Sequence, residues 1–460
     1  MSTSTRTGTY TRQDGPPQVI LGAHFPGVNN TTVWSDPASG SHIDFESFRT
    51  FAQIAESGRF DFLFLAEGLR LREQKGKIHD LDVVGRPDTL PVLAGLAAVT
   101  RRLGLAGTIN VTFNEPYEVA RQFATLDHLS AGRAAWNVVT SSDAFTGENF
   151  RRGGYLPHDQ RYVRAEEFVR AAAAIWDSWQ GREPEQFVYR SSQFDITGRP
   201  AVPSPPQGRP VIFQAGDSHQ GRDFAARNAD AIFTRHSTPQ AGRQFYSDVK
   251  ARATRAGRDP ENLKVLPGVS FVIGDTDAEA EELAAHVRSQ QVSGQTALLI
   301  LERLFNRDLS AYDPDGPLPD IEPDTEGPSL FAGRAREHDD VHAEIAALRR
   351  LARERGLSLR ETVIATQARQ SLIGSPSTVA DALIEAVSTN VCDGFILVPH
   401  ITPAGLAPFV EKVVPILQER GALRTDYPER STLRDLLGIA PPSRQESAEN
   451  DAPVFASAGL

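Results

Sequence analysis

WNVVTSSDAFTGENFRRGGYLPHDQRY, residues 136–162, is the stretch around which the chain is organised. It begins within an apolar run rich in β-branched residues, 133–140, that is bounded by Ala131-Gly132 and by Ser141-Ser142-Asp143. Such a run predicts a buried strand whose end turns polar. After a connection, apolar side chains recur at helical spacing from Tyr162 to Trp179, so the stretch is a strand leading into a helix.

Polar side chains gather where this strand ends and this helix begins. Asp159 is placed to act as the N-cap of the helix. Asn137 and Thr140 leave the end of the strand, while His158 and Tyr162 stand at the mouth of the helix. We expect these hydrogen-bonding groups to converge on a concave binding site.

Short apolar runs alternate with helical patterns along the whole chain. The eight expected strands span residues 19–25, 60–65, 103–111, 133–140, 211–214, 231–234, 264–273 and 395–399. The expected helices span residues 45–55, 90–99, 117–129, 162–179, 219–228, 240–256, a segment that begins near 277, and 407–420. Parallel strands joined by helical crossovers in this number predict an α/β fold, the (β/α)8 TIM barrel. A doubly wound open sheet is the competing architecture, but Gly22-Ala23-His24-Phe25 after the first strand is not its glycine-rich phosphate turn.

Some segments lie outside this repeating pattern. Residues 1–18 are rich in Ser and Thr and predict a flexible N-terminal arm, whereas 441–460 lack periodicity and predict a disordered tail. Residues 19–440 then form one barrel domain, with a short hairpin expected within 187–210. The segment 291–375, before the eighth strand, is far longer than an ordinary loop. It is either a surface insertion or oligomer contact, or a lid over the active site.

Composition narrows the class of partner. The formal net charge of −11 disfavours nucleic acid and anionic membranes, which both attract basic patches, so a small molecule is the expected partner. No window is long and apolar enough for a membrane span, and the first residues lack the apolar core of a signal peptide. Cys392 is the only cysteine, which excludes an intramolecular disulfide or a thiolate metal cage and fits a cytoplasmic location.

The turn after the fifth expected strand reads Ala215-Gly216-Asp217-Ser218 and opens a helix. Backbone N–H groups and the positive end of the helix dipole favour a phosphate at such a position. Alternatively, Ser218 only caps the helix, and spacing does not decide between these roles. No GxSxG elbow, Walker sequence, dinucleotide fingerprint or HExxH pattern appears, so hydrolase, phosphoryl-transfer and metal chemistry and tight NAD(P)H binding are disfavoured.

Residues 136–162, together with the preceding TLDHLSAGR at 125–133, resemble the bacterial luciferase-like flavin monooxygenases. Within that family, the resemblance is to the group that holds nitrilotriacetate monooxygenase component A, dibenzothiophene-sulfone monooxygenase and long-chain alkane monooxygenase. It extends over residues 19–420. The motifs are specific to the group and carry no information about the substrate.

The resemblance implies that six residues bind the flavin. Ser218 would contact its phosphate, and the ring and ribityl chain would be held by Glu67, Thr112, Asn137, His158 and Tyr162. The family more often has Asp at the position of Glu67, so the reach of this side chain differs by one methylene. Each position also has a plain structural reading: a solvated carboxylate at a strand end, hydrogen bonding within a turn or ladder, or packing at a helix start.

His158 is in addition the candidate catalytic residue, because a histidine that titrates near neutral pH can donate a proton or take one from the substrate. This hypothesis rests on its position at the mouth of the site. No metal site is expected.

By the same resemblance, the chain is the oxygenase component of a two-component monooxygenase. An NAD(P)H-dependent flavin reductase would supply reduced FMN, O2 would be the co-substrate, and a small organic molecule would be oxygenated. A homodimer or homotetramer is implied too. The alternatives are a deazaflavin-dependent oxidoreductase on the same barrel and a non-catalytic flavin-binding protein. The reduced cofactor that binds, and oxygen uptake above the free-flavin background, distinguish the three.

Overall fold

The computed structural model describes residues 18–27, 32–33, 36–78, 86–141, 144–150, 160–180, 183–236, 238–332, 340–367 and 371–442. The expected arm, apart from Gln18, and the expected tail from residue 443 onward lie outside these ranges.

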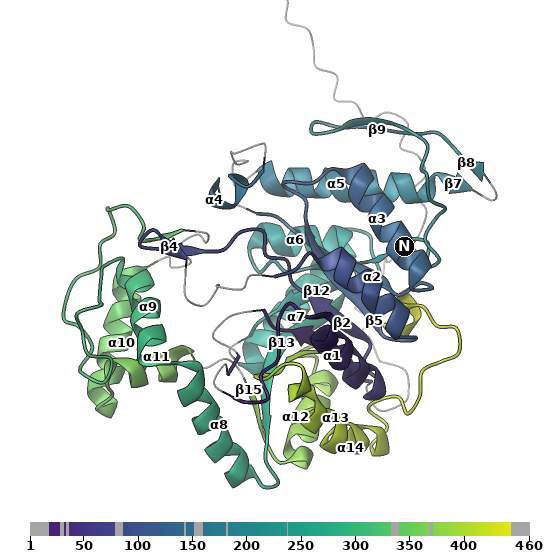
Figure 1. Ribbon diagram of the computed structural model, residues 1–460. Coiled ribbons are helices and arrows are strands. Elements are labelled where there is room, and N and C mark those ends of the chain that lie inside the picture. Colours follow the sequence, from purple (N-terminus) through teal and green to yellow (C-terminus); the bar gives the residue numbers. More distant parts are fainter. Residues whose placement is uncertain are drawn as a thin grey trace, which may run out of the picture.

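Eight parallel strands close into a barrel, which confirms the expected fold class (Figure 1). They are β1 Ile20–Phe25, β2 Phe62–Leu65, β5 Gly104–Asn110, β6 Ala134–Val139, β11 Val211–Gln214, β12 Ala231–Thr234, β13 Lys264–Ile273 and β16 Gly394–Val398. Each pairs with the next in chain order, and β16 returns to β1 with Gly394 opposite Ile20. Because β12 pairs with β13 as well as with β11, the circle is complete and the open-sheet alternative is wrong.

Helices follow the strands and cover the outside of the barrel. They are α1 Phe45–Ser57, α2 Thr89–Val99, α3 Pro116–Leu129, α5 Gln160–Asp177, α6 His219–Asn228, α7 Pro239–Arg255, α8 Asp277–Gln291, α12 Pro376–Ser388, α13 Ala407–Lys412 and α14 Val414–Glu419. The single helix expected over 407–420 is divided, because Pro415 near the start of α14 has no N–H to donate to the preceding turn. The helix α12, which begins at a Ser375 cap and Pro376, was not among the expected helices.

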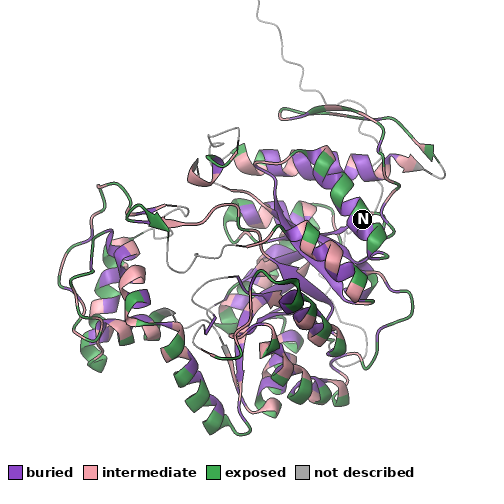
Figure 2. Ribbon diagram, in the orientation of Figure 1, coloured by how far each residue is buried: buried purple, intermediate pink, exposed green. Residues whose placement is uncertain are grey.

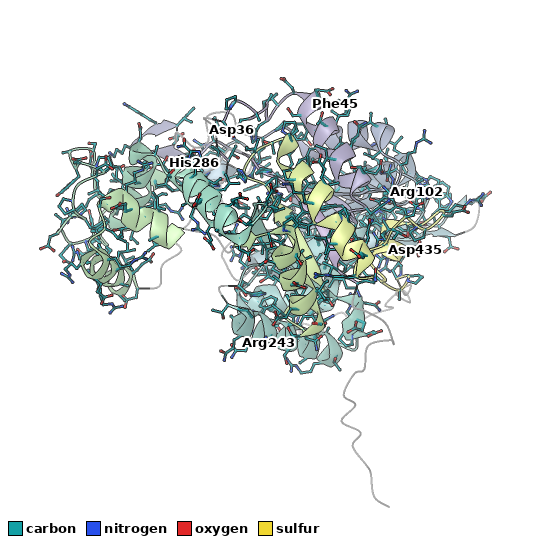
Figure 3. All side chains as sticks on the ribbon, turned by 90° about the horizontal axis from the view of Figure 1, so that it is seen from below. Asp36, Phe45, Arg102, Arg243, His286 and Asp435 are labelled. Atoms are coloured by element: carbon teal, nitrogen blue, oxygen red, sulfur yellow. The ribbon has the colours of Figure 1, made fainter. Side chains whose placement is uncertain are left out.

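The barrel strands are buried (Figure 2). Large apolar side chains fill the barrel interior, and Leu433, Leu437 and Ile439 join them at its amino-terminal end. Leu433, in the short helix α15 Leu433–Leu436, packs with Phe62 and Phe213 of the interior. A Cβ on Gly104, where β5 begins, would lie 2.5 Å from Leu433 Cδ1. Figure 3 views the molecule from below and labels Asp435 of this segment and Arg102, which donates to Pro428 O at 3.2 Å.

Buried carboxylates tie neighbouring strands together at the same end. Asp61, Asp230 and Asp393 accept, in turn, the backbone N–H of Leu21 at 2.8 Å, Ile212 at 2.9 Å and Val265 at 2.8 Å. Their basic partners are Arg424 at 2.7 Å, Arg434 at 3.0 Å and Lys250 at 3.5 Å. A buried charge that keeps its partner and its hydrogen bonds is tolerated, whereas loss of one partner is strongly destabilising. These contacts hold the bottom of the barrel rigid beneath the site.

The segment before the eighth strand folds around a small core of its own. Its helices are α9 Gly294–Phe305, α10 Val341–Arg355 and α11 Leu359–Gln367, and they lie beside the barrel at the left of Figure 1. The strand β14 Phe331–Ala332 pairs with β3 Glu73–Gln74, which forms a hairpin with β4 Lys77–Ile78 after β2. Near the end of the segment, β15 Ser371–Gly374 pairs with β13 and extends the main sheet.

Buried Glu302 of α9 joins this helical segment to the β3–β4 hairpin. Its carboxylate accepts hydrogen bonds from Gln74 Nε2 and Lys75 Nζ, both at 2.5 Å, and from Leu309 N at 2.9 Å. The hairpin expected within 187–210 is present as β9 Phe187–Arg190 and β10 Asp195–Gly198, apart from the barrel sheet, beyond a small pair β7 Trp179–Gln180 and β8 Glu183–Pro184.

Candidate functional site

The predicted site residues that the structure describes lie at the carboxyl ends of adjacent strands, β2, β5, β6 and β11, or on the helices that follow. This is the end at which parallel barrels carry their ligands. His158 and Asp159 lie outside the described residues.

The turn from β11 into α6 is closed tightly on itself. A Cβ on Gly221 would lie 2.9 Å from Gly216 Cα, and a Cβ on Gly216 would lie 2.2 Å from Gln214 Nε2. The same Cβ on Gly216 would lie 3.1 Å from the Tyr162 hydroxyl oxygen, so this hydroxyl stands directly beside the turn. Glycine at these two positions therefore leaves the space that brings the backbone, Tyr162 and the start of α6 together.

Ser218 is the N-cap of α6, because its hydroxyl oxygen accepts the Gly221 N–H at 3.1 Å. Ser218 therefore caps the helix, as the structural alternative predicted. This role does not exclude a ligand, because the residue is exposed. Neighbouring Asp217 pairs with Arg222 at 2.8 Å, which balances its charge. The positive end of α6 remains suited to a phosphate.

The Asn137 side chain points into the barrel, and only one of its two polar atoms has a hydrogen-bond partner among the described residues. Its Nδ2 donates to Thr108 Oγ1 at 2.9 Å, whereas its Oδ1 is buried with no partner among the described residues. A buried acceptor without a donor costs about 1–3 kcal/mol, so such an atom calls for an N–H or O–H from a ligand. The edge of a flavin ring offers an N–H of this kind, and the residues present therefore fit that cofactor.

Glu67 follows β2. Its carboxyl is not the solvated strand-end group that the structural alternative predicted. Burial raises the pKa of its carboxyl to about 8, against a smaller lowering by the backbone hydrogen bond from Asn110, and nearby Asp88 raises it further. At neutral pH the carboxyl is therefore largely protonated and can donate a hydrogen bond.

Thr112 is buried between the loops that follow β5 and β6. Its hydroxyl oxygen accepts the Ser141 N–H at 3.1 Å and lies 3.4 Å from Ser141 O. Its own N–H donates to Asn110 Oδ1 at 2.6 Å. This geometry gives Thr112 a structural task, and its contact with a flavin stays a prediction.

Side chains from different loops contact one another around the rim of the site, and these contacts were not predicted from the sequence. Arg70, after β2, lies 3.4 Å over the Phe145 ring of α4 Ala144–Gly147 and donates to Glu148 at 2.5 Å. Phe113, after β5, stacks on Phe150 at 4.6 Å. The loops that follow β2, β5 and β6 therefore form one connected rim.

Within the described ranges, no three or more His, Cys, Asp or Glu side chains come together as a metal site would require. A search of the described helices for one long and apolar enough to cross a membrane also finds none.

The chain is therefore a (β/α)8 TIM-barrel protein with a glycine-lined helix start and an unsatisfied interior amide at the carboxyl ends of its strands. The family described as luciferase-like monooxygenase matches residues 25–393, so the chain belongs to that family.

Relatives of known activity support this membership. The chain is 38% identical over 452 residues to nitrilotriacetate monooxygenase component A of Aminobacter aminovorans, covering 92% of this chain and 95% of that protein. It is 34% identical over 429 residues to dibenzothiophene-sulfone monooxygenase of Rhodococcus erythropolis, covering 89% and 93%. The expected group within the family is thus confirmed.

A solved structure of riboflavin lyase, with modified FMN and riboflavin, superposes with a TM-score of 0.73 at 29% identity, covering 92% of this chain and 96% of that one.

Proposed function

We propose that the chain is the oxygenase component of a two-component FMN-dependent monooxygenase. A separate NAD(P)H-dependent reductase supplies the reduced flavin, and O2 and a small organic molecule are the co-substrates. The observation that carries the proposal is the unsatisfied Asn137 Oδ1 in the barrel end of a luciferase-like monooxygenase. The relative from Aminobacter aminovorans is a "component A", which supports a separate partner protein.

In this proposal, the start of α6, with Ser218 and the Tyr162 hydroxyl beside Gly216, holds the FMN phosphate. Asn137 Oδ1 accepts a hydrogen bond from the ring, and the protonated carboxyl of Glu67 donates one to it. Thr112 keeps the β5 and β6 loops together beside the ring. When bound and reduced, FMN supplies the activation of O2 for transfer of one oxygen atom to the substrate.

His158 is proposed as the group that gives or takes a proton near the substrate. The helical segment of α9–α11 is proposed as the lid that keeps water out, because Glu302 couples it to the hairpin directly after Glu67. A cytoplasmic homodimer or homotetramer is proposed from the family resemblance.

The test begins with anaerobic binding of reduced FMN to the wild-type chain and to Asn137→Ala. Loss of one hydrogen bond to the ring weakens binding about tenfold. The control is Asn228→Ala, at the far end of α6, where the side chain only donates to Phe224 O. Equal affinity of both variants for FMN would contradict the placement of Asn137.

Oxygen uptake in the presence of a flavin reductase then separates the alternatives. Uptake above the free-flavin background supports a monooxygenase. Binding of reduced deazaflavin in preference to FMN, without uptake, would replace the proposal with a deazaflavin-dependent oxidoreductase. Binding of FMN without uptake across a substrate panel would favour a non-catalytic flavin-binding protein.

A further inference from the structure

Two buried polar atoms at the carboxyl end of β12 have no hydrogen-bond partner among the described residues. They are Thr234 Oγ1 and His236 Nε2, and neither is among the groups predicted to bind the flavin. The two residues are only 4% and 9% exposed. A buried polar atom without a partner costs about 1–3 kcal/mol, so we expect a water or a ligand to meet these two atoms.

The Thr234 side chain lies on the helix side of β12. It follows the alternation of the strand, because Ile232 packs in the core between strands and helices and Phe233 packs in the barrel interior. The neighbouring strand β11 pairs with β12, with Gln214 opposite Ile232. Continued by two residues, this register brings Thr234 level with Gly216. The Thr234 hydroxyl therefore lies beside the turn that leads into α6.

The imidazole of His236 is held between α6 and α7. Its ring centroid lies 4.9 Å from that of Phe245 in α7, and the guanidinium of Arg222 in α6 lies 4.6 Å over the same Phe245 ring. Burial lowers the pKa of His236; Asp217 raises it and Arg222 lowers it further by smaller amounts, so the imidazole is neutral at neutral pH. The effect of Asp217, the residue before Ser218, places His236 near the start of α6. A neutral imidazole with its proton on Nε2 donates one N–H there.

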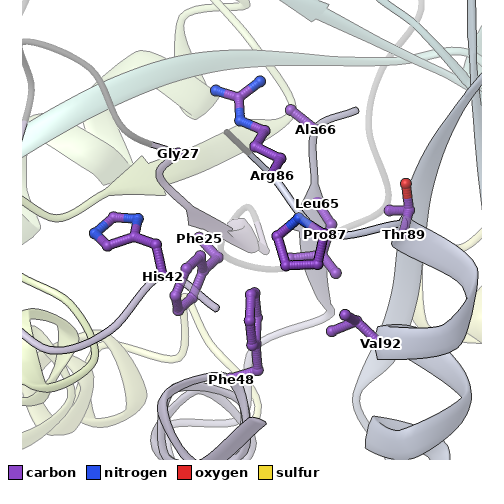
Figure 4. A pocket seen from close by; sticks show the side chains of 10 residues that line it. All are labelled: Phe25, Gly27, His42, Phe48, Leu65, Ala66, Arg86, Pro87, Thr89 and Val92. Atoms are coloured by element: carbon purple, nitrogen blue, oxygen red, sulfur yellow. The ribbon is translucent and has the colours of Figure 1, made fainter. Parts of the chain in front are cut away.

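The hollow at the ends of β1 and β2, between α1 and α2, is a less suitable place for a ligand (Figure 4). Its walls include the apolar side chains of Phe25, Phe48 and Leu65. Its cavity volume is about 20 Å³, which is room for about one water. A phosphate or an organic group does not fit there, whereas the turn beside the end of β12 is open to solvent at Ser218.

We propose that Thr234 and His236 are further phosphate-binding residues and that they make the site specific for a phosphorylated flavin. The Thr234 hydroxyl and the His236 Nε2–H donate to the phosphate oxygens from the end of β12, opposite the first N–H groups of α6. This proposal rests on the proposed function, because FMN is the ligand. Neutral donors at a helix start hold a phosphate through hydrogen bonds and the helix dipole, so no lysine or arginine is needed.

The alternative occupant is a single buried water that satisfies both atoms and has no part in binding. The two occupants differ in the effect of Thr234→Val, which replaces the hydroxyl by a methyl group of the same shape. If the hydroxyl waits for a phosphate, the flavin-free protein loses nothing by this change, because an atom without a partner is removed. If the hydroxyl binds a structural water, the same change lowers the stability of the flavin-free protein.

The test is anaerobic titration with reduced FMN and with reduced riboflavin, which lacks only the phosphate. We expect the wild type to bind FMN at least about a hundredfold more tightly than riboflavin. Thr234→Val and His236→Asn, whose shorter amide does not reach the position of Nε2, should each weaken FMN binding at least about tenfold and leave riboflavin binding within about twofold. His236→Gln restores an N–H near that position and should keep FMN affinity within about threefold of the wild type. Without flavin, the Tm of Thr234→Val should equal or exceed that of the wild type.

The matched control is Thr125→Val, at an exposed position in α3, which should change neither affinity. If His236→Asn does not fold, the result for Thr234→Val decides. Equal weakening of both flavins, or unchanged FMN affinity in Thr234→Val together with a lower Tm, would overturn the proposal in favour of a structural water and leave the proposed function in place. A wild type that binds neither flavin would refute the proposed function, and this proposal would fall with it.

Discussion

Glu67→Gln should stabilise the protein, and by an amount that grows with pH. The folded chain holds the Glu67 proton up to about pH 8, whereas an unfolded chain releases it near the ordinary value of 4.5. Between these values the folded state binds one more proton than the unfolded state, so the free energy of unfolding falls by about 1.36 kcal/mol per pH unit. Over the whole window the wild type loses at most about 5 kcal/mol, and a neutral Gln, which keeps an oxygen for the Asn110 N–H, loses none of it.

Thermal unfolding followed from pH 4.5 to pH 9 measures this difference. An unfolding entropy of about 2.1 cal/mol/K per residue gives about 1 kcal/mol/K for a chain of this length, so the Tm of Glu67→Gln should exceed that of the wild type by up to about 5 °C at pH 8. Near pH 4.5 the two should unfold together. Glu411→Gln, at an exposed position in α13, is the matched control and should show no such trend. A Tm difference that stays constant across the pH range would refute the account of a buried, protonated carboxyl.

Three further changes test other parts of the structure. Gly216→Ala places a methyl group against Gln214 and Tyr162 and should weaken binding of reduced FMN by about 1–3 kcal/mol in an anaerobic titration. The control, Gly198→Ala, meets only ordinary van der Waals contacts and should leave FMN binding unchanged. Glu302→Gln removes the charge that faces Lys75 and should lower the local stability of the α9–α11 segment by about 2 kcal/mol or more, so limited proteolysis should cleave this segment faster. The control is Glu354→Gln, at an exposed position, and equal cleavage rates of the two variants would contradict the coupling. Leu433→Ala should destabilise the barrel by about 2–5 kcal/mol in thermal unfolding, and Leu129→Ala, at a side chain 61% exposed, by far less. Similar Tm values for the last pair would show that the bottom of the barrel does not depend on Leu433.

The barrel strands could be predicted because both faces of a parallel barrel strand are buried, so each strand reads as a continuous apolar run. The run FDFLFL at 60–65 contains β2, and KVLPGVSFVI at 264–273 is β13 without change. The expected starts of α6 at 219 and of α8 near 277 agree with the structure, where Ser218 and Thr276 cap the two helices. In these cases the local sequence carries the whole signal.

Contacts between distant segments could not be predicted in the same way. Leu433 lies in a short helix whose partners, Phe62 and Phe213, are hundreds of residues away, and no local periodicity announces that contact. The strand pairing of Phe331 with Gln74 has the same character. By contrast, α12 begins with a readable local signal, a Ser375 cap before Pro376, and this signal was missed.

The position of the candidate site could be predicted from the sequence, but the protonation and hydrogen bonding of its residues could not. Strand-end residues such as Glu67 and Asn137 could be chosen from the resemblance, because the carboxyl end of a barrel strand is where function resides. The protonation of Glu67 depends on its burial, and the unsatisfied Asn137 Oδ1 depends on Thr108 taking the other end of the amide. Asn110, which holds the Thr112 N–H, was missed for the same reason: its role is defined by neighbours in space.

The seal at the amino-terminal end of the barrel has a consequence for the order in which the molecule is completed. Tyr427 donates to Phe60 O across 367 residues at 2.6 Å, and Leu433 enters an interior whose walls begin with Ile20. During synthesis on a ribosome, the apolar interior therefore stays open at the amino-terminal end of the barrel until almost the entire chain has emerged. Pairings of such high sequence separation form slowly, and an unfinished barrel exposes aggregation-prone strands meanwhile. Nascent chains of this protein should consequently depend on chaperones until residue 439 is free, and the last step of folding should be the docking of the C-terminal segment.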